Sequence, residues 1–124
     1  HVGCEHGICG ACTILFNNEP VRSCLMLAPQ IDNGEITTIE GISENSSYDD
    51  LREAFKKYHA LQCGYCTPGF ITTIVYLLEK KQFLKEEEIR EKLSGNICRC
   101  TGYTGIVKAV EEVFLNRFKK SKND

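Results

Sequence analysis

Eight cysteines carry the chemistry that this sequence could perform, and they fall into two groups of four. The first group has the spacing C-x4-C-x2-C-x11-C and consists of Cys4, Cys9, Cys12 and Cys24. The second group has the spacing C-x2-C-x31-C-x-C and consists of Cys63, Cys66, Cys98 and Cys100. Four thiolates are the ligand set of structural zinc sites and of iron-sulfur clusters. Each group could therefore hold one metal centre.

A disulfide framework is another explanation for eight cysteines in a chain of 124 residues. Cys98 and Cys100 argue against it, because a bridge between them would close a very small ring, whereas bridged cysteines prefer Cα atoms about 5.5 to 6 Å apart. The separation into two quartets argues in the same direction, as do long helical patterns that need no cross-links. The sequence therefore favours metal binding.

The spacing of the first group indicates the kind of metal centre. C-x4-C-x2-C followed by a more distant cysteine is the ligand pattern of plant-type 2Fe-2S ferredoxins. Gly7 and Gly10, within CEHGICGAC, let backbone amides approach cluster sulfurs. The second group alone does not exclude zinc, because CxxC pairs also build zinc sites. We expect 2Fe-2S clusters in both groups, and the alternative is a zinc-stabilised structural or interaction module without a redox role.

The composition gives no sign of other partners. Fifteen basic and 17 acidic residues leave a net charge of -2, so there is no electrostatic argument for nucleic-acid binding. The most apolar run, FITTIVYLL, is interrupted by threonines and is shorter than the roughly 20 residues of a membrane span. We therefore expect a soluble chain with no membrane span.

Strand patterns occupy the first third of the chain. Apolar and β-branched residues dominate 13–16 (TILF) and 21–27 (VRSCLML), and residues 35–40 (EITTIE) alternate with a period of two. Asn17 and Asn18 suit the tight turn of a hairpin, because asparagine tolerates the left-handed region. A hairpin and a third strand are predicted.

A polar stretch over 41–50, GISENSSYDD, is typical of a linker and places a boundary near Ser46. It divides the chain into two domains, 1–45 and 46–124. Apolar residues at helical spacing then predict four helices with short connections, typical of a small bundle, over 49–58, 67–81, 85–96 and 105–118.

Two of the cysteines, Cys66 and Cys100, directly precede apolar helical patterns, in CTPGFITTIV and CTGYTGIVKAV. Thr67 is expected to cap the first of these helices, with Pro68 at its first position. We expect both cysteines at helix N-termini, where the partial positive charge lowers the pKa of a thiol.

Together, CEHGICGAC, VRSC, TIEG, QCGYCTPG and GNICRCTGY resemble the motif set of the small iron-sulfur subunit of the molybdenum hydroxylases, the xanthine oxidase and carbon monoxide dehydrogenase family. The resemblance covers nearly the whole chain. It implies an α+β fold, in which a β-grasp, ferredoxin-like 2Fe-2S domain precedes a four-helix-bundle 2Fe-2S domain. The family normally has some forty further residues ahead of His1, so the resemblance implies that the first domain is truncated here.

The resemblance also implies an electron relay with no substrate chemistry on this chain. The first four cysteines match the ligands of the cluster nearer FAD, and the second four match those of the cluster nearer molybdenum. A large partner subunit would hold the molybdopterin cofactor and hydroxylate a substrate, and electrons would leave one at a time for an FAD-binding subunit. The whole would be a cytoplasmic, multi-subunit oxidoreductase; a stand-alone ferredoxin-type carrier is a further alternative.

Residues other than the cysteines could also contribute to a site. Gln62 matches the glutamine that touches the pterin in relatives, although a helix-end hydrogen bond to the backbone would also explain it. Each quartet is complete without histidine, so we expect surface or loop positions for His1, His6 and His59. Arg99 could donate to a cluster or a partner, or remain a solvated charge. Tyr103 is expected to pack and to hydrogen-bond through its hydroxyl.

Overall fold

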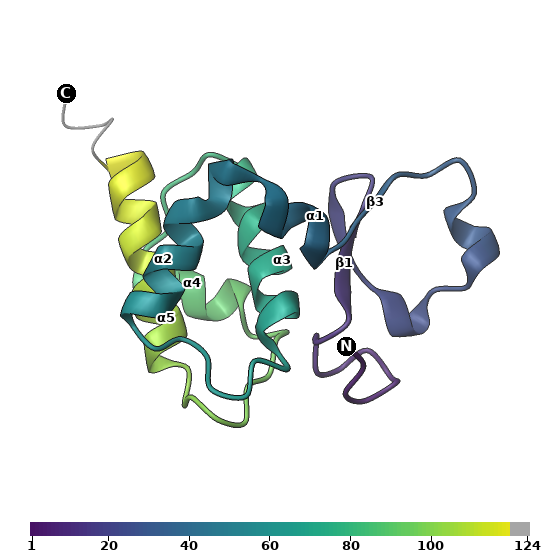
Figure 1. Cartoon of the computed structure of the whole chain (residues 1–124), viewed down its shortest axis with the longest axis horizontal. Helices are drawn as coiled ribbons and strands as arrows, with labels where there is room; N and C mark the ends of the chain where they lie inside the picture. Colours follow the sequence, from purple (N-terminus) through teal and green to yellow (C-terminus); the bar gives the residue numbers. More distant parts are fainter. Residues whose placement is uncertain (120–124) are drawn as a thin grey trace.

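The structure is a computed structural model that describes residues 1–119. Residues 119–124 (KKSKND) are expected from their polar sequence to form a frayed tail, and apart from Lys119 they lie outside this range. The strands are β1 (Thr13–Phe16), β2 (Glu19–Arg22) and β3 (Ile36–Thr37). The α-helices are α1 (Ile39–Glu44), α2 (Asp49–Lys57), α3 (Thr67–Glu79), α4 (Glu86–Lys92) and α5 (Thr104–Phe114). In Figure 1 the strands lie on one side of α3, and α2, α4 and α5 lie on the other. The fold is thus a small sheet packed on helices.

The three strands form an antiparallel sheet in the order β2-β1-β3. Asn17 and Asn18 have φ angles of 49° and 66°, which a two-residue hairpin turn requires, so the predicted hairpin is confirmed. The second strand begins earlier than predicted and ends at Arg22, where a 3-10 turn, Ser23–Leu25, follows. The third strand is shorter than predicted, because the chain turns into α1 at Ile39.

The interpretation of 41–50 as a linker is wrong. These residues complete α1, form a 3-10 turn at Ser46–Tyr48 and begin α2. The side chains of Ile42 and Tyr48 are buried, with 4% and 8% exposure, and the Asn45 carboxamide caps the 3-10 turn by accepting from the amide of Ser47. Two apolar anchors among polar residues are enough to pack the segment against the core, while its polar side chains face solvent.

All four predicted helices are present. Their apolar faces are buried in one cluster that extends to Leu15 of β1. The helix α3 lies at its centre and buries side chains from Phe70 to Leu78. The predicted cap of α3 is off by one position, because Cys66 is the N-cap and Thr67 is already helical. The helix that positions the second cysteine group is therefore held by the core on nearly all sides.

Among residues 1–119, none of the helices combines the length and the apolar character that crossing a membrane requires.

Candidate metal centres

The loop before β1 folds around the sulfur of Cys4. Backbone amides of His6, Ile8 and Cys9 donate to the Cys4 Sγ at 3.4, 3.3 and 3.4 Å. Gly7, at a φ of 80°, supplies the left-handed backbone that this tight path needs. Hydrogen bonds from Cys9 and then from His6 lower the pKa of the Cys4 thiol to about 6. This loop thus favours the thiolate, which is the form that binds metal.

The hairpin brings Cys12 and Cys24 together, because one precedes β1 and the other follows β2. The amide of Cys24 lies 3.4 Å from the Cys12 Sγ, and the two thiols are also hydrogen-bonded. Burial acts to raise the pKa of Cys12, but the hydrogen bonds from Cys24 outweigh it and the pKa is lowered. The pKa of Cys24 is raised by burial and by its bond to Cys12, although the amide of Gly7 acts to lower it.

The second group is built around Cys66 and Cys98. Cys66 is the N-cap of α3, and Cys98 lies in the loop after α4. Burial and then a thiol hydrogen bond to Cys98 raise the pKa of Cys66 to about 12. The predicted lowering of this pKa by the helix dipole is wrong, because burial next to other thiols dominates. Burial acts to raise the pKa of Cys98 too, but hydrogen bonds from Thr101 outweigh it and the pKa is lowered.

The other two cysteines of this group, Cys63 and Cys100, are exposed. The amide of Tyr65 approaches the Cys63 Sγ at 3.5 Å. The prediction that Cys100 lies at a helix N-terminus is wrong, because α5 begins only at Thr104. A turn through Tyr103, whose φ is 71°, separates this cysteine from the helix. The second group therefore has a buried side and an exposed side.

All eight cysteines are free thiols. Among residues 1–119, no three Cys, His, Asp or Glu side chains are arranged to hold one metal ion. The sulfurs instead contact each other in pairs, which are Cys4 with Cys9, Cys12 with Cys24, and Cys66 with Cys98. A 2Fe-2S cluster takes its four thiolates as two pairs, one on each iron, and is tuned by hydrogen bonds to sulfur. The two thiol pairs of the first group, with their amide donors, fit such a cluster, and the second group supplies one such pair together with the exposed Cys63 and Cys100.

Comparison with known proteins identifies the family. The 2Fe-2S binding domain family matches residues 38–111. The chain is 51% identical over 116 residues to the caffeine dehydrogenase subunit gamma of Pseudomonas sp. (strain CBB1), covering 91% of this chain and 70% of the relative. It belongs to the iron-sulfur subunits of the molybdenum hydroxylases.

Further relatives agree with this assignment. The nicotine 6-hydroxylase small subunit of Paenarthrobacter nicotinovorans is 55% identical over 109 residues, which cover 88% of this iron-sulfur subunit and 66% of the relative. The crystal structure of quinoline 2-oxidoreductase from Pseudomonas putida 86 superposes with a TM-score of 0.86 at 41% identity, covering 99% of this chain and 75% of that chain. The aldehyde oxidoreductase from Desulfovibrio gigas superposes with a TM-score of 0.85 at 37% identity, covering 96% of this chain but 14% of that one.

The other predicted site residues lie at the surface of this iron-sulfur subunit. Gln62 is exposed, and its side chain forms no hydrogen bond with residues 1–119, so the helix-end bond considered from the sequence is not made. Arg99 is exposed as well. The three histidines are exposed as expected; the His1 ring stacks on Tyr65 at 4.4 Å, and the His6 Nδ1 lies 2.6 Å from the Cys4 carbonyl oxygen.

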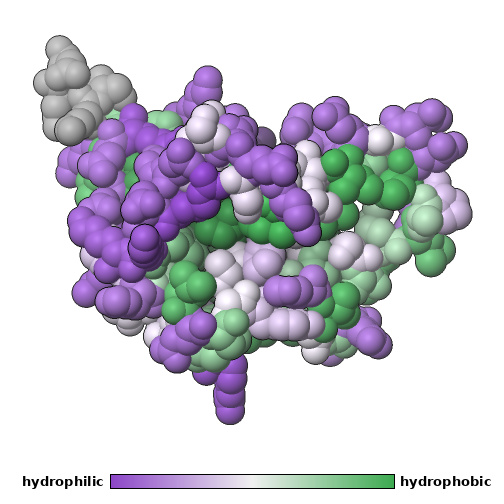
Figure 2. Space-filling model, in the orientation of Figure 1, coloured by the Kyte–Doolittle hydropathy of each residue, from purple (hydrophilic) through white to green (hydrophobic). Residues whose placement is uncertain are grey.

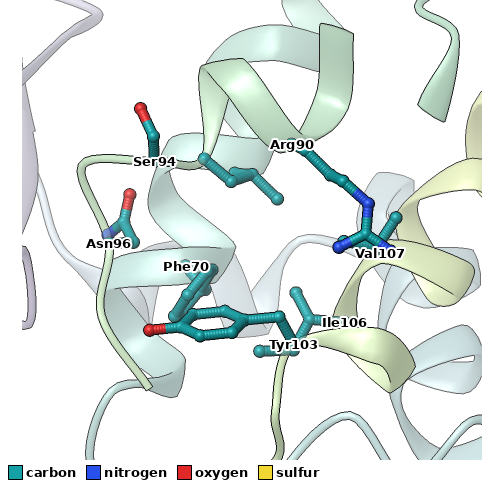
Figure 3. A pocket seen from close by; sticks show the side chains of 8 residues that line it. Phe70, Arg90, Ser94, Asn96, Tyr103, Ile106 and Val107 are labelled. Atoms are coloured by element: carbon teal, nitrogen blue, oxygen red, sulfur yellow. The ribbon is translucent and has the colours of Figure 1, made fainter. Parts of the chain in front are cut away.

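Tyr103 links the second group to a cavity of about 220 Å³ between α3, α4 and α5. Its hydroxyl accepts from the amide of Cys98 at 3.1 Å, as expected of a packed tyrosine with a bonded hydroxyl. Its ring lies 6.4 Å from that of Phe70. Figure 3 shows the two rings on one side of the cavity and Arg90 extending over the other. The loop that carries Cys98 therefore rests on aromatic packing.

Two polar residues near the cysteines were not selected from the sequence. Arg22 and Asn96 each precede a cysteine of a different group by two positions, and both lie between the groups. That shared position, in VRSC and GNIC, was the only signal that could have identified them.

Proposed function

We propose that this subunit holds two 2Fe-2S clusters and relays electrons between a molybdopterin cofactor on a large partner subunit and FAD on another partner. The observation that carries the proposal is the pairing of sulfurs within loops whose amides point at them. Membership of an iron-sulfur family disfavours the zinc module. The relatives are named as subunits of dehydrogenases and hydroxylases, which supports a multi-subunit oxidoreductase. A cytoplasmic location is part of the proposal.

We propose that each of two domains holds one cluster. Residues 1–45 would be a ferredoxin-like β-grasp domain and residues 46–124 a four-helix-bundle domain. The first cluster would be held by Cys4, Cys9, Cys12 and Cys24, and the second by Cys63, Cys66, Cys98 and Cys100. When bound, each cluster takes up and releases one electron at a time. The chain's residues contribute the thiolates, the amide donors and the burial, which together set the reduction potential of each cluster.

Exposed residues near each centre suggest which partner subunit that centre faces. Gln62 and Cys63 are exposed at the second centre, so we propose that this surface meets the molybdopterin subunit. Ile8, Leu25 and Leu27 are exposed by 57%, 58% and 69% near the first centre. Figure 2 shows hydrophobic surface at the end of the molecule where Figure 1 draws the segment after β2. Apolar surface of this kind is typical of an interface, and we assign it to the FAD-binding partner.

The test is the iron and acid-labile sulfide content of protein purified without air, with EPR of the dithionite-reduced sample. We expect about four irons and four sulfides per chain and two distinguishable 2Fe-2S signals. Zinc without sulfide would overturn the proposal and leave a structural module. Copurification then separates a subunit from a stand-alone carrier, because only the subunit binds a molybdenum protein.

Thr101 provides a finer test, because its hydroxyl donates to the Cys98 Sγ at 3.1 Å. A donor to a ligand sulfur favours the more negative, reduced cluster, so Thr101→Val is expected to lower the reduction potential of the second cluster. One lost hydrogen bond of about 0.5 to 1.5 kcal/mol corresponds to roughly 20 to 65 mV for a one-electron couple. A redox titration followed by EPR measures the shift. Thr101→Ser keeps the hydroxyl and should keep the potential; an equal potential in the valine variant would contradict the assignment.

A further inference from the structure

The loops that carry the two cysteine groups are joined by direct hydrogen bonds. The amide of Ile97 donates to the carbonyl oxygen of Cys9 at 2.9 Å. The next residue after Ile97 is Cys98, so this backbone hydrogen bond connects a cysteine of the first group with the residue directly before a cysteine of the second. We call the contact of residues 95–97 with Cys9 and Gly10 the joint.

Asn96 anchors the joint from the helical side. Its side chain is buried, with 4% exposure, and its Nδ2 lies 3.3 Å from the carbonyl oxygen of Gly10. Its Oδ1 accepts from the Thr73 hydroxyl of α3 at 3.1 Å. Burying a carboxamide costs free energy unless its polar atoms are hydrogen-bonded. The Asn96 side chain therefore favours the arrangement in which Gly10 and Thr73 are both within hydrogen-bond distance.

Arg22 anchors the joint from the sheet side. Its Nη2 donates to the carbonyl oxygen of Gly95 at 2.6 Å, and its Nη1 donates to the Thr13 Oγ1 at 2.6 Å. The Thr13 hydroxyl in turn donates to the carbonyl oxygen of Gly10 at 2.6 Å. The guanidinium thus ties both strands of the hairpin to the loop after α4, with two donors in a fixed fork.

Glycine makes the close approach possible. A Cβ atom on Gly69 would lie 2.1 Å from the carbonyl oxygen of Gly10, and a Cβ on Gly10 would lie 2.5 Å from that of Gly95. Neither position has room for a side chain, so the backbones of the two loops and of α3 are in contact. Such a joint has little freedom to change its spacing.

We propose that Asn96 and Arg22 are positioning residues for electron transfer between the two centres. They hold the loop with Cys98 against the loop with Cys9, which keeps the separation of the centres fixed and the Ile97 to Cys9 hydrogen bond closed. The inference rests on the proposed function, since it requires two clusters. In the step concerned one electron leaves a reduced centre and enters an oxidised one, and no bond or proton changes at the joint.

The test compares wild type with Asn96→Leu and Arg22→Lys in the intact protein, as purified with its partners. The first readout is the magnetic interaction between the two reduced clusters, seen as splitting of their EPR signals at low temperature. The second is hydrogen exchange at the Ile97 amide. We expect about four irons per chain in every variant. In Asn96→Leu and Arg22→Lys the splitting of the EPR signals should be lost or broadened. Exchange at the Ile97 amide should be about tenfold faster, because a hydrogen bond that holds the joint has been removed.

Arg90→Gln is the matched control, because Arg90 lies beside the cavity but bonds to Glu86 and not to the joint. It should keep both readouts at wild-type values. If Asn96→Leu loses iron, the inference is tested on the milder Arg22→Lys variant, which keeps a positive charge at this position. Unchanged splitting and exchange in a variant that keeps both clusters would overturn the inference, whereas a wild-type protein without two clusters would overturn the proposed function itself.

Discussion

Replacing Cys12 with serine is expected to halve the iron content, from about four to about two irons per chain, because the first cluster loses a ligand and the second keeps all of its own. Cys12 is the most buried cysteine, with 4% exposure, and its sulfur accepts from the amide of Cys24. A serine hydroxyl fits the same space but is a much poorer iron ligand. Iron and sulfide assays with EPR should show one signal lost and the other intact.

His6→Gln is the control for this variant. His6 lies in the same loop but is directed at a backbone carbonyl, so it should retain about four irons. Loss of iron from the histidine variant, or two intact EPR signals in Cys12→Ser, would contradict the ligand assignment.

Replacing Phe70 with alanine is expected to lower the free energy of unfolding by about 3 to 5 kcal/mol. The side chain is 1% exposed, on the helix at the centre of the core, and it borders the cavity under Tyr103. The loss is a large part of the roughly 5 to 15 kcal/mol that stabilises a typical domain. Denaturant unfolding of the cluster-loaded protein, followed by circular dichroism, measures it.

Phe70→Leu is the matched control and should cost less, about 1 to 2 kcal/mol, because it keeps a branched apolar side chain that fills part of the space of the ring. A loss below about 1 kcal/mol in the alanine variant would mean that the site collapses to fill the space, and that Tyr103 and the Cys98 loop do not depend on this ring.

Much of the architecture could be predicted because its determinants are local. The helices follow from apolar residues at helical spacing, and all four were found close to their predicted positions. Asn17 and Asn18 specified the hairpin by their tolerance of positive φ. The cysteine groups were visible from spacing alone, and the assignment of all eight as cluster ligands stays a prediction.

The errors arose where the local structure or the pKa depends on residues that are far apart in the sequence. The segment 41–50 has the composition of a linker, but Ile42 and Tyr48 find apolar partners elsewhere in the fold. The pKa of Cys66 depends on burial and on thiols up to 32 positions away, which helix position does not reveal. Asn96 is the clearest case, because its partner carbonyl lies 86 residues away in the sequence.

That separation of 86 residues between Asn96 and Gly10 also has a consequence during synthesis. A ribosome adds about 5 to 20 residues per second, so Cys9 and Gly10 leave the tunnel roughly 4 to 17 seconds before the residues that dock on them. During that interval the first cysteine loop lacks its contacts with residues 95–97, and its sulfurs are less shielded from any iron donor or oxidant that reaches the nascent chain. The joint can close only after residues 95–97 have emerged, so the first site is completed well after its own cysteines have left the tunnel.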